Sequence, residues 1–168
     1  MVGGLNSSAL KLTQLPDANA AVGLAVRFMV GHPAYADLPF GSWSAALCNQ
    51  VGRGHYAFVV DSNNEVVGYA GWAMAPEAKA EAWAEGQLEL SDEECRVGDC
   101  LIMNAWIANS NAVNRFLVDA VRAGAQDKKT IYFRRLYPDG RRRVVRLSVN
   151  EFAASHLARN AAAGGSDI

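Results

Sequence analysis

The chain has 168 residues, of which 51% are hydrophobic and 20% charged, and its formal net charge is -1 at pH 7. This length fits one domain with a single core, and the apolar content excludes a disordered chain. A net charge near zero gives no global attraction to nucleic acid. No apolar run approaches the ~18 residues of a membrane span, and the N-terminus lacks signal-peptide features, so we expect a cytoplasmic protein.

The first half of the chain predicts two helices, a hairpin and a third helix. Residues 1–16 are rich in small polar residues and predict a flexible arm, after which Asp17 can cap a helix. Ser42 can cap the second helix, and Asn63-Asn64 suits the hairpin turn because Asn tolerates positive φ. The predicted elements are helices at 18–30 and 42–49, strands at 55–61 and 65–74, and a helix at 76–84.

In the second half, an acidic loop precedes a nearly continuous apolar stretch, which is typical of a strand covered on both faces. Ser110 can cap the helix that follows, and Pro138-Asp139-Gly140 predicts a hairpin turn. The predicted elements are a loop at 85–99, a strand at 100–108, a helix at 111–123, strands at 130–136 and 141–147, and a helix at 149–160.

This order predicts an α/β (α+β) fold in which a mixed, mostly antiparallel central sheet has helices on both faces. We expect a single domain over residues 17–160, between the flexible arm 1–16 and a loose tail at 161–168. The three cysteines form no C-x-x-C motif, so they indicate neither a disulfide framework nor a zinc site, and we expect buried free thiols. The histidines also lack metal-ligand spacing, so no metal is expected.

Residues 49–54 place two glycines in a pattern that superficially resembles a pyrophosphate-binding loop. Such a loop follows a strand and opens a helix, whereas here a helix precedes the glycines and a strand follows them. The stretch therefore favours a helix C-cap and turn, and coenzyme A-dependent acetylation is the weaker interpretation.

The three histidines differ in their predicted settings. His156 is placed on the outer face of the last helix and is expected to be solvated, while His55 opens a strand and favours a structural role. His32 lies in a loop between Gly31 and Pro33, where a rigid turn could present its ring to a cleft. Both a functional and a structural role remain open for His32.

Positive charge is concentrated between residues 122 and 146, a stretch that contains nine basic residues and only two acidic ones. Arg134 and Arg135 lie on one strand of the second hairpin, and Arg141 and Arg143 on the other, so some of these side chains share one side. Such a patch attracts an acidic partner or a phosphate. The alternative is a solvated sheet edge that discourages aggregation.

Several short motifs, in order, resemble the RTX-toxin-activating lysine acyltransferases over roughly residues 18–147. They are Pro39, Tyr56-Ala57, Tyr69-x-x-Trp72-Ala73, Trp106-Ile107-Ala108 and Phe133-Arg134-Arg135 before Pro138-Asp139. The resemblance implies a GNAT-like fold, commonly dimeric, in a small cytoplasmic transferase. It also implies transfer of a fatty acyl group from acyl-acyl carrier protein, as donor substrate, to a lysine of a protein acceptor, with no bound cofactor.

The chain departs from that family at the residues its chemistry needs. A lysine amine has an unperturbed pKa of about 10.4, so a base must remove its proton. The family uses a histidine four residues before the proline that matches Pro39, where this chain has Tyr35. It uses an aspartate just before the Trp-Ile-Ala motif, where this chain has Ala105, with Asn104 one position earlier.

Two hypotheses follow. In the first, the protein is an acyl-carrier-dependent lysine acyltransferase in which His32 is the base and Tyr35 and Asn104 support it. The candidates for docking the acidic carrier are Arg134, Arg135, Arg141 and Arg143. In the second, the protein is a catalytically inactive relative that binds a carrier, an acyl chain or a protein partner. In both, a homodimer is expected.

Overall fold

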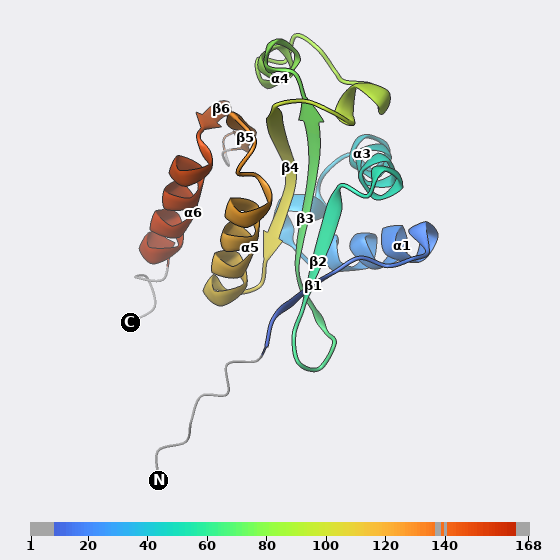
Figure 1. Cartoon of the computed structure of the whole chain (residues 1–168). Helices are drawn as coiled ribbons and strands as arrows, with labels where there is room; N and C mark the ends of the chain where they lie inside the picture. The colour runs from blue at the N-terminus through green and yellow to red at the C-terminus, as the bar shows by residue number, and fades with distance from the viewer. Residues whose placement is uncertain (1–8, 137–138, 140, 164–168) are drawn as a thin grey trace.

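The computed structural model of the chain describes residues 9–136, 139 and 141–163; the side chains of residues 135, 136 and 159–163 lie outside this description (Figure 1). Six strands, six α-helices and one short 3-10 helix are assigned in these residues. They are β1 (Lys11–Thr13), α1 (Ala18–Met29), α2 (Pro33–Ala36), α3 (Phe40–Arg53), β2 (Tyr56–Val60), β3 (Val66–Ala75), α4 (Glu77–Ala84), η1 (Glu93–Cys95), β4 (Cys100–Ala108), α5 (Asn111–Gly124), β5 (Thr130–Leu136), β6 (Arg142–Leu147) and α6 (Val149–Ala163).

The strands form one sheet in the order β1-β2-β3-β4-β5-β6. All neighbours are antiparallel except β4 and β5, which run parallel. Helices α1 and α3 pack on one face and α5 and α6 on the other, while α4 lies near the beginning of β4 and β5 (Figure 1). This arrangement confirms the predicted mixed sheet with helices on both faces and is consistent with a GNAT-like fold.

Local sequence signals set several element boundaries. The Asp17 carboxylate accepts a hydrogen bond from the Ala20 N–H (2.6 Å), and the Ser110 hydroxyl accepts one from the Val113 N–H (3.2 Å). Each side chain satisfies a main-chain donor that the first helical turn leaves unpaired. Gly54 ends α3 with φ 73, and Asn64 takes φ 60 in the hairpin turn. The helix C-cap interpretation of residues 49–54 is therefore confirmed.

Other boundaries differ from the predictions. α3 begins at Phe40 rather than near Ser42, because Pro39 occupies the N-cap position and Ser42 lies inside the helix. Residues 33–36 form the short helix α2. Residues 11–13, expected in a flexible arm, pair with β2 as strand β1. The nearby Gln14 side chain donates to the carbonyls of Gly54 (2.9 Å) and Tyr56 (2.5 Å), which fastens the segment to the domain.

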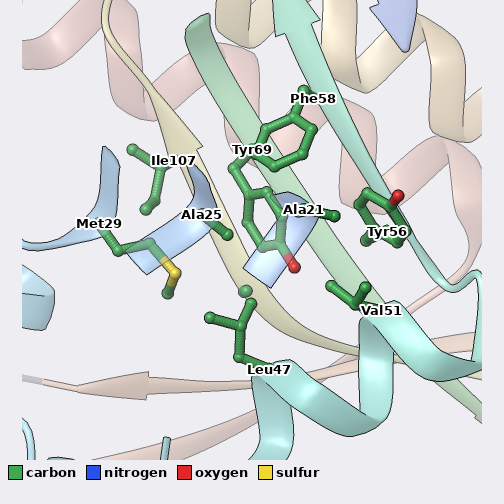
Figure 2. Close-up of a cluster of buried hydrophobic side chains, with 10 residues drawn as sticks. Ala21, Ala25, Met29, Leu47, Val51, Tyr56, Phe58, Tyr69 and Ile107 are labelled. Atoms are coloured by element: carbon green, nitrogen blue, oxygen red, sulfur yellow. The ribbon is translucent and has the colours of Figure 1, made fainter. Parts of the chain in front are cut away.

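One core lies between the sheet and helices α1 and α3 (Figure 2). Tyr69 and Phe58 are fully buried there, with their ring centroids 5.3 Å apart. Ala21 and Ala25, at successive turns of α1, let that helix approach the aromatic rings closely. Among the described residues, no helix is long and apolar enough to cross a membrane.

The cysteines are all free thiols, as predicted, but only two of them are buried. Cys95 and Cys100 lie in the core under α4, and burial is the main cause that raises the pKa of Cys100 to about 11. Cys48 is exposed on α3, so the prediction of burial is wrong for this residue.

Two glycines test how tightly the fold is packed. A Cβ atom at Gly98 would lie 2.0 Å from the main-chain carbon of Ala75, so we expect Gly98→Ala to lower the free energy of unfolding by roughly 3 kcal/mol. Gly23 lies in α1 with open space around it, so Gly23→Ala should raise that free energy by about 1 kcal/mol. Urea denaturation measures both, and equal effects would contradict the tight contact at Gly98.

Candidate active site

The sheet opens between β4 and β5. These strands pair only from Cys100 with Thr130 to Ile102 with Tyr132, although both continue beyond that point. A cavity of about 400 Å³ occupies the opening. Its lining residues are Ala34, Tyr35, Met103, Asn104, Ala105, Trp106, Phe133, Arg134, Phe152 and His156. The lining includes residues from the helix layers on both faces of the sheet, so the cavity passes between the two layers.

A β-bulge in β4 shapes this opening. Ala105 pairs with Gly71 and Met103 pairs with Trp72, which leaves Asn104 as an extra residue. Met103 packs with the α5 and α6 core, whereas Ala105 packs with the α1 and α3 core, and Asn104 bonds to α3. The bulge therefore turns two successive side chains toward the same face, and it places Asn104 at the edge of the cavity.

Asn104 is held by a short hydrogen-bond chain. The Gln50 side-chain amide donates to Asn104 Oδ1, and Gln50 Oε1 accepts from the Tyr69 hydroxyl (3.0 Å). Gln50 is 2% exposed, and a Cβ atom at Gly71 would lie 2.1 Å from its Oε1, so the glycine makes room for it. Burial raises the pKa of Tyr69 well above its usual value, which keeps this donor protonated. Because Gln50 engages the Asn104 oxygen, the donors of the Asn104 NH₂ group stay available for another partner.

Tyr35 completes the open edge of β4. Its hydroxyl accepts a hydrogen bond from the Trp106 N–H (3.0 Å) and lies 3.4 Å from the Trp106 carbonyl oxygen. It thus bonds main-chain groups that have no strand neighbour on this side. Burial raises the pKa of Tyr35, so the phenol stays protonated near neutral pH and is a hydrogen-bonding group rather than a base.

His32 is separate from these two residues. It occupies the N-cap position of α2, and its ring packs edge-on against Phe28 with centroids 4.8 Å apart. It does not contribute to the lining of the cavity between β4 and β5. The structure therefore brings Tyr35 and Asn104 together at one cavity but leaves the predicted base outside it.

His156 lies in that cavity instead. The prediction that it is solvated is wrong, because its ring is half-buried and packs 4.1 Å from the Phe152 ring and 5.1 Å from the Trp106 ring. Its Nδ1 lies 3.1 Å from the Phe152 carbonyl oxygen. The spacing of Phe152 and His156, one helical turn apart, is a sequence signal that could have placed both on the inner face of α6.

The third histidine has the structural setting that was predicted. His55 stacks on Trp72 with ring centroids 6.1 Å apart, and its Nδ1 lies 3.4 Å from Arg53 Nε. Arg53 is almost fully buried and pairs with Asp92 at 2.6 Å. Burial, and then the neighbouring Arg53 charge, lower the pKa of His55, so its ring is neutral at pH 7.

The basic hairpin is divided between two faces. Arg134 lies over the Trp83 ring (4.0 Å), contacts the Trp83 carbonyl and is 19% exposed, so it faces α4 and the cavity rather than open solvent. Arg135 pairs in register with Arg143, and its side chain lies outside the described part of the structure. Arg143 is exposed, and the exposed Arg141 bonds Asp139 at 2.5 Å.

A second contact ties this hairpin to α4. Arg146 of β6 binds Glu81, and it also bonds Glu85 at 3.1 Å. The hydrogen bond from Arg146 is the first cause that lowers the pKa of Glu81. Glu81 of α4 and Glu85, the C-cap residue of that helix, therefore hold β6 in place.

Comparison with known proteins bears on what this cavity does. The model of the RTX toxin acyltransferase family matches residues 15–150. The chain belongs to the RTX toxin acyltransferase family. No curated protein matches the sequence. The match to the RTX toxin acyltransferases includes Tyr35, Asn104 and Arg134, and it ends before His156.

Within the described ranges, no three His, Cys, Asp or Glu side chains form a group that could hold a metal ion.

The hydrogen-bond chain behind Asn104 can be tested by a double-mutant cycle. Gln50→Met leaves the Tyr69 hydroxyl buried without its acceptor, so we expect the free energy of unfolding to fall by about 2 kcal/mol. In the Tyr69→Phe background the same change should cost clearly less, because the stranded hydroxyl is gone. Urea denaturation of the four proteins measures the coupling. Strictly additive effects would contradict the proposed chain.

Proposed function

We propose that this protein transfers a fatty acyl group from acyl-acyl carrier protein to a lysine of a protein acceptor, with the thioester held in the opening between β4 and β5. Membership of the RTX toxin acyltransferase family supports an acyl-transfer reaction. The observation that carries the proposal is the shared cavity, which brings His156 together with Tyr35 and Asn104. These groups supply a candidate base and two hydrogen-bond donors around one space.

His156 replaces His32 as the proposed base. A carbonyl oxygen only accepts hydrogen bonds, so the contact of His156 Nδ1 with the Phe152 carbonyl favours a proton on Nδ1. In the neutral ring the lone pair then lies on Nε2. That nitrogen can take a proton from the lysine ammonium and leave a neutral amine able to attack the thioester.

The reaction needs charge stabilisation and proton return. The amine nitrogen bonds to the thioester carbonyl carbon, and negative charge builds on the carbonyl oxygen. The Asn104 NH₂ group is proposed to donate to that oxygen, together with the Tyr35 hydroxyl, whose one proton would turn to it from the Trp106 carbonyl. The Arg134 guanidinium adds positive charge from the cavity wall. The carbon–sulfur bond then breaks, and the carrier thiolate takes the proton from the imidazolium to leave as a thiol. The new amide nitrogen still holds one proton too many, and it releases that proton through the regenerated neutral imidazole to solvent.

The second candidate is a binding protein without catalysis. It is favoured by Tyr35, which the resemblance aligns with the histidine of the family and whose raised pKa removes it as a base. Ala105, aligned with the aspartate of the family, has no side chain that could orient a base. On this reading the cavity would hold the acyl group of a carrier without transferring it.

Mass spectrometry of acylated products distinguishes these candidates. The protein is incubated with acyl-acyl carrier protein and lysine-bearing acceptors, including N-α-acetyl-lysine. We expect His156→Gln to lower the transfer rate by a factor of ~100 or more, because it removes the base. His32→Gln, the matched control outside the cavity, should stay within about threefold of wild type.

The outcomes separate cleanly. Loss of transfer in His32→Gln with activity kept in His156→Gln would show that the base is assigned to the wrong histidine. Carrier binding with no transfer by the wild-type protein would favour the binding protein over the enzyme.

Docking of the acidic carrier is proposed at the exposed arginines of the second hairpin. We expect Arg143→Glu to weaken carrier binding by roughly tenfold at low salt, with a smaller effect at high salt because exposed charges are screened. Arg27→Glu makes the same charge reversal on the exposed side of α1 and should change affinity little. Isothermal titration at two salt concentrations measures this, and equal losses in both variants would reject a local docking site.

A further inference from the structure

A second cavity, of about 280 Å³, lies under α5 on the sheet face opposite α1 and α3. Strands β1 to β4 form its floor, and α5 forms one wall. Representative lining residues are Leu12, Ala57, Trp72, Met103, Leu117 and Ala120. Of the described residues that line it, Lys128 alone carries a charge. The cavity therefore suits an aliphatic ligand far better than a polar one.

The single charge does not change this conclusion. Lys128 Nζ lies 3.0 Å from the Gly98 carbonyl oxygen and 3.1 Å from an Asp127 carboxylate oxygen. These partners engage the ammonium, which leaves the hydrocarbon stem of the side chain to line the cavity. A ligand in the cavity thus meets methylene groups rather than an ammonium that lacks a counter-charge.

This cavity shares a wall with the candidate active site. Met103 lines both cavities, and it immediately precedes Asn104, the bulge residue at the edge of the reaction cavity. The Met103 side chain packs on the α5 side of the sheet. Methionine is unbranched and flexible, so its side chain suits a movable wall between the two spaces.

The volume fits a fatty chain. Small residues on facing elements create it, with Ala57 and Ala70 on the sheet and Ala120 and Gly124 on α5. A cavity of about 150 Å³ accommodates a benzene ring, so one of this size has room for an aliphatic chain on the order of ten carbons. Larger side chains at these positions would therefore shorten the chain that the cavity can hold.

We infer that the cavity under α5 receives the hydrocarbon tail of the acyl donor, with Met103 as the gate between tail and thioester. The inference rests on the proposed function only in that the tail belongs to the thioester in the β4–β5 opening. Binding of the tail requires no transfer, so it can be measured by itself.

The test is isothermal titration of the full chain with dodecanoyl-pantetheine and acetyl-pantetheine. Wild type should bind the dodecanoyl thioester more tightly. Ala120→Phe fills the cavity from α5 and should weaken dodecanoyl binding at least tenfold while leaving acetyl binding unchanged. Ala123→Phe, on the exposed side of the same helix, is the matched control and should change neither. Ala57→Leu fills the cavity from the sheet and gives the same expectation if Ala120→Phe fails to fold.

Two results would overturn the inference. One is that the wild-type protein shows no preference for the long chain, and the other is that a cavity-filling variant that folds keeps the wild-type affinity for the dodecanoyl thioester. Failure of the proposed function is visible separately. A wild-type protein that binds dodecanoyl-pantetheine with this dependence but never acylates an acceptor refutes catalysis and retains the tail site. A protein that acylates acceptors without this dependence retains catalysis and refutes the tail site.

Discussion

The rest of the structure depends on how β4 is paired. It bonds β3 along nearly its whole length but bonds β5 only over its first three residues. A buried strand edge left open in this way exposes polar main-chain groups that need partners. The Tyr35 hydroxyl is the partner of the Trp106 main chain, and the bulge places the polar side chain of Asn104 at the same cavity. The divergence of two parallel strands therefore creates both the cavity and the need for the residues that line it.

The proposed chemistry draws its base from an unexpected element. The position aligned with the family histidine holds a buried phenol, which bonds the main chain of β4 and is not a base. α6 brings an imidazole to the opposite side of the opening, and the Phe152 carbonyl of the same helix sets the orientation of the ring. One helix thus provides the proposed base, the carbonyl that contacts its Nδ1 and part of the surrounding apolar wall.

Much of the fold could be predicted because its signals are local. The caps Asp17 and Ser110, the Asn64 turn and the apolar run of β4 act within a few residues, and the structure confirms them. Contacts distant in sequence could not be predicted. β1 forms because it pairs with β2, and His156 faces inward because its ring packs against Trp106 and Phe133, which are distant in sequence. The roles proposed for Tyr35 and Asn104 stay predictions, although the structure places both at one cavity.

The attachment of β6 to α4 has a mechanical consequence. Since β5 is joined to β4 by so short a ladder, the position of the hairpin also depends on contacts outside the sheet. The Arg146 contacts with Glu81 and Glu85, and the stacking of Arg134 on Trp83, supply these outside contacts. Substitutions at Glu81 or Trp83 would then loosen the hairpin relative to the rest of the sheet without replacing any residue that lines the β4–β5 cavity.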